Sequence, residues 1–150
     1  MRLREELPEF SRTTQWMNGN VTKLNLIGEV PILVHFWSVS CHVCEGAFKI
    51  INDWKRIYGD KFKLVGVHMP RSKEDVNNRL IQAKAFQMNM TNPICLDHNL
   101  EITQKYQNRV VPTYYLFDKQ GLLRHIQIGE LGLKMLEKRL VLLMNESKKY

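Results

Sequence analysis

The sequence predicts one α/β domain over residues 1–150, with a mixed central sheet flanked by helices on both faces. Two patterns predict this fold class. An apolar run at Ile32–Trp37, a helical apolar stripe and a second apolar run at Phe62–Met69 make a strand–helix–strand unit of about forty residues, which is the parallel βαβ unit with a right-handed crossover. Later in the chain, residues 113–128 have the pattern of an antiparallel hairpin, so the sheet combines both strand directions.

The first strand, Ile32–Trp37, is apolar and β-rich throughout and follows Pro31, as expected of a central strand buried on both faces. The helix after it has apolar residues at three- and four-residue spacing and is expected to end near Gly59. Its stripe consists of Ala47, Ile50, Ile51, Trp54, Ile57 and Tyr58. The next strand, Phe62–Met69, ends at Pro70.

The middle of the chain is expected to hold a helix, a short strand and a short helix. Ser72 followed by Asp75 resembles a capping box and predicts a helix start. The apolar stripe of this helix is expected to be Val76, Leu80, Ala83 and Phe86. A short strand follows at Pro93–Leu96, and a short helix at Leu100–Tyr106.

The last third of the chain is expected to form a hairpin and a closing helix. The strands Thr113–Phe117 and Leu122–Ile128 are joined by the turn residues of the loop 118–121. The closing helix has a leucine stripe at helical spacing, formed by Leu133, Leu136, Leu140 and Leu143.

The composition is that of an ordinary globular protein, with 44% hydrophobic and 25% charged residues. Lys and Arg outnumber Asp and Glu by 22 to 15, a net charge of +7. Because these charges are spread along the chain and the only short basic cluster is Lys148–Lys149, we expect a solvated basic surface and no nucleic-acid partner. The longest apolar stretch, near Pro31–Trp37, is too short to cross a bilayer, so no membrane partner is expected.

The three cysteines are Cys41, Cys44 and Cys95. An odd number, with two of them separated by two residues, fits a reducing compartment and one reactive pair better than a secreted disulfide framework. The N-terminal sequence MRLREELPEF has no apolar segment of the signal-peptide kind. We therefore expect a cytoplasmic protein, and a monomer.

The motif Cys41-His42-Val43-Cys44 lies where the buried strand gives way to the helix. Amide groups and the macrodipole at a helix N-terminus favour a negative charge there, and so favour the nucleophilic thiolate over the thiol. Cys44 follows one helical turn later, so the two sulfurs can stand side by side and form a reversible disulfide. An attacking sulfur must also be exposed.

Other uses of a C-x-x-C motif fit the surroundings less well. Haem attachment needs His directly after the second cysteine, and position 45 is Glu. A zinc site needs two further ligands, which Cys95 with His42 or His98 could supply, although no second C-x-x-C is present. Two inert buried cysteines are the third alternative. We expect no metal and no cofactor.

The segment Val34–Cys44 resembles the active-site segment of thioredoxins, in which a strand ends in Phe-Trp shortly before C-x-x-C. Val110–Thr113 resembles their second signature, a hydrophobic residue and a cis-proline that open the next strand. The intervening Val67–Ser72 is similar to the TlpA/ResA-type branch of this family. The resemblance covers nearly the whole chain. It implies the thioredoxin fold and dithiol–disulfide exchange, with Cys41 attacking and Cys44 resolving.

The resemblance also implies a substrate site. A cis bond before Pro112 would aim the Val111 backbone at an extended substrate segment, which binds as an added strand. Trp37 is expected to cap the groove beside Cys41, with a packing role as its alternative. For Cys95, a small buried hydrophobe is the expectation and a redox role the alternative.

Two positions depart from the family pattern. His35 stands where thioredoxins have a buried Asp that handles the proton of the resolving cysteine, and Ala47 stands where ResA-like proteins have Glu. His35 is either a proton-transfer group or a core histidine bonded to backbone. His42 and Val43 replace Gly-Pro between the cysteines, and a protonated His42 would stabilise the Cys41 thiolate, whereas a neutral one would not.

The sequence thus predicts an oxidoreductase that reduces protein or small-molecule disulfides through a Cys41–Cys44 disulfide, and that is reduced in turn by an electron donor not yet identified. Two alternatives stay open. One is a non-catalytic metal or copper carrier on the same fold. The other is a thiol peroxidase, although such enzymes usually use a single attacking cysteine without a C-x-x-C partner.

Overall fold

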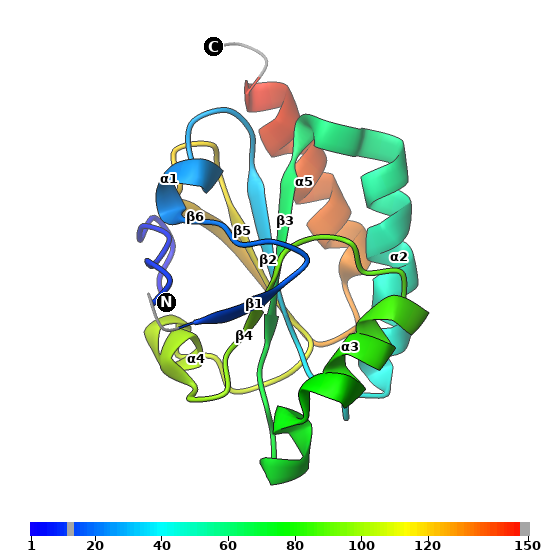
Figure 1. Ribbon diagram of the computed structural model, residues 1–150. Helices are drawn as coiled ribbons and strands as arrows, with labels where there is room; N and C mark the ends of the chain where they lie inside the picture. The colour runs from blue at the N-terminus through cyan, green and yellow to red at the C-terminus, as the bar shows by residue number, and fades with distance from the viewer. Residues whose placement is uncertain (12–13, 148–150) are drawn as a thin grey trace.

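The computed structural model describes residues 1–11 and 14–147, and its described strands form one six-stranded sheet (Figure 1). The strand order is β1-β4-β3-β2-β5-β6. The strand β2 (Ile32–Trp37) pairs in parallel with β3 (Lys63–His68) and antiparallel with β5 (Thr113–Phe117), which confirms the mixed sheet.

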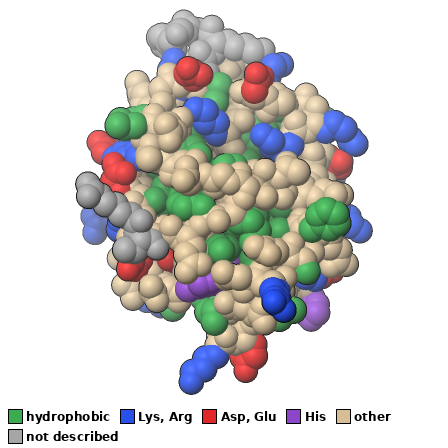
Figure 2. Space-filling view, in the orientation of Figure 1, with side chains coloured by type: hydrophobic (Ala, Val, Ile, Leu, Met, Phe, Trp, Pro, Cys, Tyr) green, Lys and Arg blue, Asp and Glu red, His purple; other side chains and the backbone are tan. Residues whose placement is uncertain are grey.

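The basic pair Lys148–Lys149 lies outside the described residues. Figure 2 shows Lys and Arg side chains scattered over one face of the molecule and gathered nowhere on it.

The strand β2 lies at the centre of the sheet, and all six of its residues are buried. Helices α2 (Val43–Tyr58) and α5 (Leu133–Ser147) cover one face, and α1 (Lys23–Leu26) and α4 (Glu101–Tyr106) lie on the other (Figure 1). Because both faces are covered, β2 has no polar alternation, as its sequence predicted. The core on the α2 and α5 side includes Leu33, Trp54 and all four leucines of the predicted closing stripe.

The helix α2 begins and ends where the sequence predicted. Gly59 closes it with a φ of 58°, in the left-handed region that favours glycine, and its N–H bonds the carbonyl of Lys55. The hydrophobic stripe is buried at Ala47, Ile51 and Trp54 but leaves Ile50 and Ile57 in solvent.

The prediction for residues 72–86 is wrong in two respects. Ser72 caps nothing with its side chain; a short 3-10 helix, η2 (Lys73–Val76), comes first, and α3 (Asn78–Gln87) begins only at Asn77, whose side chain accepts from the N–H groups of Arg79 and Leu80. The predicted apolar stripe faces solvent, and the buried residues of α3 are Ile81 and Ala85. Leu80, Ala83 and Phe86 do share one face of α3, but Ile81 and Ala85 lie on the opposite face, and it is that face which packs against the core.

The segment before Ile32, to which the sequence assigned no element, supplies an edge of the sheet. The strand β1 (Gln15–Met17) pairs antiparallel with β4 (Ile94–Leu96), and Trp16 lies opposite Cys95. Further on, α1 begins at Thr22 with a capping box formed with Asn25. A three-residue strand and a four-residue helix are too short to show a period in the sequence.

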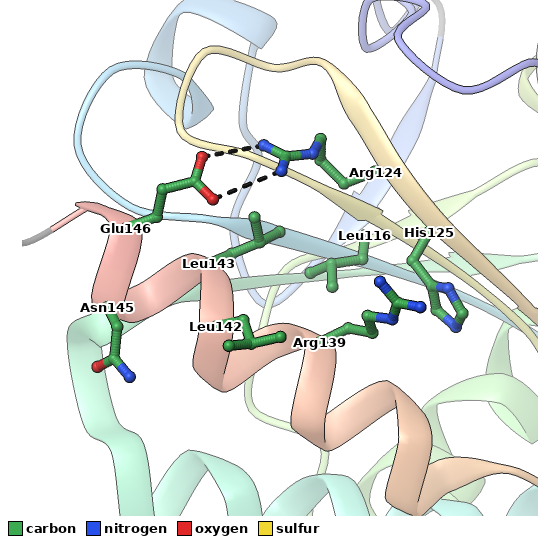
Figure 3. Close-up of a pocket in the computed structure, with 8 residues that line it drawn as sticks. All are labelled: Leu116, Arg124, His125, Arg139, Leu142, Leu143, Asn145 and Glu146. Atoms are coloured by element: carbon green, nitrogen blue, oxygen red, sulfur yellow. Dashed lines mark hydrogen bonds and ion pairs between the residues drawn. The ribbon is translucent and has the colours of Figure 1, made fainter.

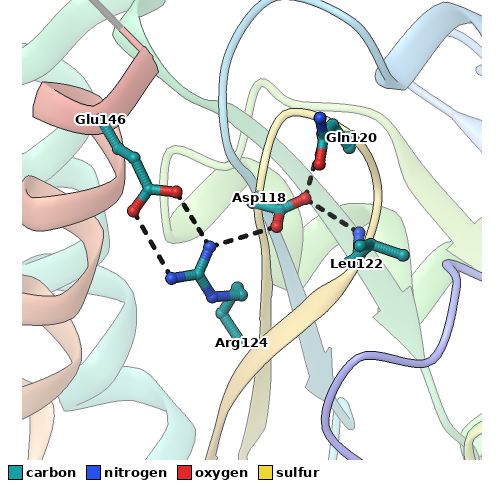
Figure 4. Close-up of polar contacts among 5 residues, drawn as sticks. All are labelled: Asp118, Gln120, Leu122, Arg124 and Glu146. Carbon is teal, nitrogen blue, oxygen red and sulfur yellow. Dashed lines mark hydrogen bonds and ion pairs between the residues drawn. The ribbon is translucent and has the colours of Figure 1, made fainter. Parts of the chain in front are cut away.

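The predicted hairpin is confirmed as β5 and β6 (Leu123–Ile128), and Asp118 organises its turn (Figure 4). The Asp118 carboxyl accepts the N–H groups of Gln120 and Leu122, each at 3.0 Å, and its second oxygen lies 3.2 Å from Arg124 Nη1. Arg124 also pairs with Glu146 of α5 at 3.0 Å, so one guanidinium joins the turn to the last helix.

Candidate active site

Cys41 and Cys44 form a disulfide at the end of β2 where α2 begins, with their Cα atoms 5.4 Å apart. His42 occupies the N-cap position of α2, and Cys44 lies in the first turn. The exposed fraction is 5% for Cys41 and 0% for Cys44. Of the two sulfur-bearing residues, only Cys41 therefore reaches the surface, and in the oxidised state its exposed fraction is small.

The loop that presents Cys41 is held by the segment that follows β3. Ser38 Oγ donates to the carbonyl of Met69, and Met69 N–H donates back to the carbonyl of Trp37 at 2.8 Å. Val39 N–H donates to Nε2 of His68 at 3.0 Å. These bonds tie the loop that leads from β2 to Cys41 to the end of β3, its parallel neighbour in the sheet.

The peptide bond between Val111 and Pro112 is cis, as expected. The side chain of Val111 is buried, whereas that of Val110 is 46% exposed. Gly129 N–H donates to the Pro112 carbonyl at 2.8 Å, and Thr113 Oγ1 to the Val110 carbonyl at 2.6 Å. The segment enters β5, the antiparallel neighbour of β2, and so lies at the same end of the sheet as the disulfide.

His35 lies in the core, 2% exposed, in the face of β2 that α2 covers. Its ring stacks on Tyr114 with centroids 4.6 Å apart and meets the edge of Phe48 at 5.3 Å. Burial lowers the pKa of His35 to about 3, so the imidazole is neutral at physiological pH. The expected backbone bond is absent at Nε2, which has no partner among the described residues.

The prediction that Trp37 caps a groove beside Cys41 is wrong, because its side chain is 0% exposed. The indole packs edge-on against Phe48 at 5.3 Å and His68 at 4.9 Å. Trp37 points to the same face of β2 as His35, two residues earlier, and α2 covers that face. The packing role, which was the alternative, is the one observed.

Sequence reasoning missed His68 as a residue of the site. It is fully buried at the end of β3, opposite Trp37, and its Nε2 accepts the Val39 N–H. Burial lowers the pKa of His68 to about 4, with nearby Asp75 acting in the opposite direction. The available signal was a polar residue within an otherwise apolar strand, which normally requires a partner when buried.

The remaining sequence candidates are separated by their burial. His42 is exposed and makes no capping bond, while Glu45 in the first turn of α2 pairs with Lys84 of α3 at 2.6 Å. Cys95 is buried and free, and burial raises the pKa of its thiol. A neutral, enclosed thiol is a poor nucleophile, in agreement with the expected packing role of Cys95.

Hollows on the described surface lie away from the disulfide. One lies between β6 and α5, where Arg139, His125 and Leu142 line it with five others (Figure 3), and none of its lining residues comes from the loops around Cys41. Within residues 1–11 and 14–147, no three His, Cys, Asp or Glu side chains are grouped to hold a metal ion, and no helix is long and apolar enough to cross a membrane.

Known proteins resemble this chain in both amino-acid sequence and fold. The model of the AhpC/TSA family matches residues 3–126. The thiol-disulfide oxidoreductase YkuV of Bacillus subtilis (strain 168) is 46% identical over 139 residues, which are 93% of this chain and 94% of YkuV. Protein DipZ of Mycobacterium bovis is 32% identical over 146 residues, but the match spans only 21% of DipZ. A solution structure of a thioredoxin-like protein in the oxidized form has a TM-score of 0.89 and 44% identity over 97% of this chain and 99% of that one.

Proposed function

Because this chain belongs to the AhpC/TSA family and is a thioredoxin-like thiol–disulfide oxidoreductase, we propose that it reduces disulfides, with Cys41 attacking and Cys44 resolving. The thioredoxin fold predicted from the sequence is confirmed. The observation that carries the proposal is the Cys41–Cys44 disulfide at the start of α2, with Cys41 alone at the surface.

The reaction transfers two electrons from the dithiol to the substrate. The Cys41 thiolate attacks one sulfur of a substrate disulfide, the substrate S–S bond breaks, and the first substrate thiolate leaves. Cys44 loses its proton and attacks the Cys41 sulfur of the mixed disulfide, which releases the second substrate thiolate and forms the Cys41–Cys44 bond. An external dithiol must then reduce that bond, and it is the electron donor still to be identified.

The roles follow from the position of each sulfur. Cys41 precedes the first turn of α2, where the positive end of the helix dipole favours a thiolate. Cys44 is fully enclosed, so no substrate disulfide can reach it, and only the neighbouring Cys41 sulfur can. Exposed His42 lies beside Cys41, and in its protonated form it would stabilise the same thiolate.

Substrate binding is assigned to the backbone of Val111 and Pro112. A cis bond turns the chain beside the disulfide, and an extended substrate segment can pair there as an added strand. His35 is proposed to tune the core beneath α2, the helix that contains Cys44, through its contact with Phe48. A neutral imidazole with a pKa of about 3 is a weak base, so a hydrogen-bonding role fits it better than proton transfer.

We further propose that the protein acts as a monomer in the cytoplasm on disulfide-containing proteins or small molecules. The cysteine usage supports the cytoplasmic location, because the described residues contain one disulfide, at the reactive site, and one buried free thiol. Fluorescence microscopy of a tagged chain and light scattering of the purified protein test the two parts. Export to the cell surface, or a stable dimer, would contradict them.

The decisive experiment separates the two cysteines. Cys41→Ser should abolish disulfide reduction, whereas Cys44→Ser should still attack and accumulate mixed disulfides that dithiothreitol releases. Cys95→Ser is the matched control and should turn over normally, because its thiol is enclosed. Equal trapping by the Cys41 and Cys44 variants would refute the assignment. Consumption of hydrogen peroxide at a comparable rate would favour a thiol peroxidase, and stoichiometric metal in the reduced protein would favour a carrier.

A further inference from the structure

The guanidinium of Arg71 is fixed one residue away from Cys41. Its Nε and Nη2 both donate to Ser40 Oγ, at 3.2 and 3.0 Å. Ser40 Oγ in turn donates to Asp75 Oδ2 at 2.8 Å, and the same oxygen accepts the Arg71 backbone N–H at 2.8 Å. Because Asp75 is 2% exposed, the cluster has a buried anchor and an exposed cation.

A second exposed arginine stands on the neighbouring loop. Arg109 precedes Val110 and the cis-proline, and its side chain makes no hydrogen bond or ion pair within the part of the chain that the structure describes. The two arginine loops are joined, because Asn108 Nδ2 lies 3.4 Å from Met69 Sδ and 3.0 Å from the Val110 carbonyl. The loops that carry the two arginines therefore lie together at the end of the sheet where Cys41 opens to solvent.

The carboxyl groups nearby are mostly engaged. Glu45 is paired with Lys84 at 2.6 Å, and Asp75 accepts two hydrogen bonds in a buried position. Glu74 on η2 is exposed and is the opposing charge of this region. An arginine whose planar fork is already held loses little freedom on binding a carboxylate, and it still has N–H groups that Ser40 does not use.

We propose that Arg71, assisted by Arg109, makes this oxidoreductase selective for disulfides that carry a carboxylate close to the reacting sulfur. Arg71 acts by binding the substrate carboxylate, and Ser40 acts by positioning Arg71. The inference rests on the proposed attack by Cys41 and adds a substrate class to it. The carboxylate can belong to a small disulfide or to an acidic residue beside a cysteine in a peptide.

The experiment compares three disulfides of similar size and different charge. Dithiodipropionate is anionic, hydroxyethyl disulfide is neutral and cystamine is cationic. Each rate constant for attack by the reduced protein is divided by that of dithiothreitol with the same disulfide, which removes the intrinsic reactivity of the substrate. Wild type should favour the anion over the neutral disulfide by about three- to tenfold, with the cation slowest, as expected for unit charges a few ångströms apart near a surface.

Matched variants identify the source of the selectivity. Arg71→Gln should reduce the anion-to-neutral ratio about threefold, and Arg71→Gln with Arg109→Gln should bring it close to one. Ser40→Ala keeps every charge and should still lower the ratio, because it frees the guanidinium. Arg139→Gln removes the same charge from α5, outside these loops, and should leave the ratio unchanged.

The outcomes are distinct. An unchanged ratio in Arg71→Gln, or an equal fall in Arg139→Gln, overturns the inference, since net charge alone would then explain any preference. Full selectivity in Ser40→Ala overturns the positioning role of Ser40. If the wild-type protein does not reduce even the neutral disulfide, the proposed function itself is refuted. Disulfide-linked Asp-Cys and Asn-Cys peptides repeat the comparison for a peptide source, and the Asp form should be favoured by wild type and by Arg139→Gln but not by Arg71→Gln with Arg109→Gln.

Discussion

Mild acid should destabilise this protein through two buried imidazoles. His35 is 2% exposed and His68 0%, and burial lowers their pKa values to about 3 and about 4. The ordinary pKa of histidine, about 6.5, applies to the unfolded chain. Between that value and the folded pKa, the unfolded state takes up protons that the native state excludes. Stability is therefore present above about pH 6.5 and is lost as the pH falls through this window.

The magnitude follows from the distance between the pH and the unfolded pKa. A pH of about 5 lies about 1.5 units below the unfolded pKa, and each unit corresponds to about 1.4 kcal/mol. Each buried histidine therefore lowers the free energy of unfolding by about 2 kcal/mol at that pH. Both together cost about 4 kcal/mol, against a typical domain stability of about 5–15 kcal/mol. Protonation of His68 at Nε2 would also remove the acceptor of the Val39 N–H, which holds the loop before Cys41.

Urea unfolding of the oxidised protein at about pH 7.5 and about pH 5 measures the loss. His35→Phe preserves the ring stacked on Tyr114, and His68→Asn preserves an acceptor for Val39; each should remove about half of the pH dependence. Ile51→Val is the control, because a lost methylene lowers the free energy of unfolding equally at both pH values. If both histidine variants lose as much stability on acidification as wild type does, the buried imidazoles are not the cause.

Three further predictions concern other parts of the molecule. Cys95→Ala should lower the free energy of unfolding by about 1–2 kcal/mol and leave the rate of disulfide exchange unchanged; a slower exchange would give the buried thiol a redox role. Asp118→Ala should cost about 2–3 kcal/mol in urea unfolding, because two backbone N–H groups and Arg124 lose their acceptor, and a loss below about 0.5 kcal/mol would contradict the turn's dependence on it. The reduction potential of the Cys41–Cys44 pair, measured by alkylation after equilibration with glutathione, should lie at roughly −270 to −200 mV; a value near −120 mV would contradict a reductase.

The parts of the fold that the sequence predicted correctly are long and strongly periodic. The run Ile32–Trp37 and the helix ending at Gly59 each agree with a single local pattern, and the fold leaves that pattern undisturbed. The disulfide followed from the short C-x-x-C motif in the right context, and the cis bond before Pro112 followed from the resemblance of Val110–Thr113 to the second signature of thioredoxins. Both kinds of signal are local, so one sequence is enough to find them.

The errors arose where contacts between distant parts of the chain determine the local structure. Asp75 looked like the N3 residue of a helix, but its carboxyl is bonded to Ser40, thirty-five positions away in the chain. Trp37 looked like a surface residue because it precedes the reactive loop, yet its place in β2 turns it under α2. His68 accepts a bond from Val39 across a parallel strand pair, and no local pattern encodes such a contact.

The pairing of β1 with β4 has a practical consequence for anyone who shortens the chain at its N-terminus. Removal of residues through Met17 would leave β4 as the edge strand, with a row of open hydrogen-bonding groups that invite another molecule to pair there. The same deletion would take Trp16 away from its place opposite Cys95 and uncover a third thiol. A truncated protein should thus form aggregates and intermolecular disulfides that have nothing to do with its reactive pair, so a redox assay is safest on a chain with β1 intact.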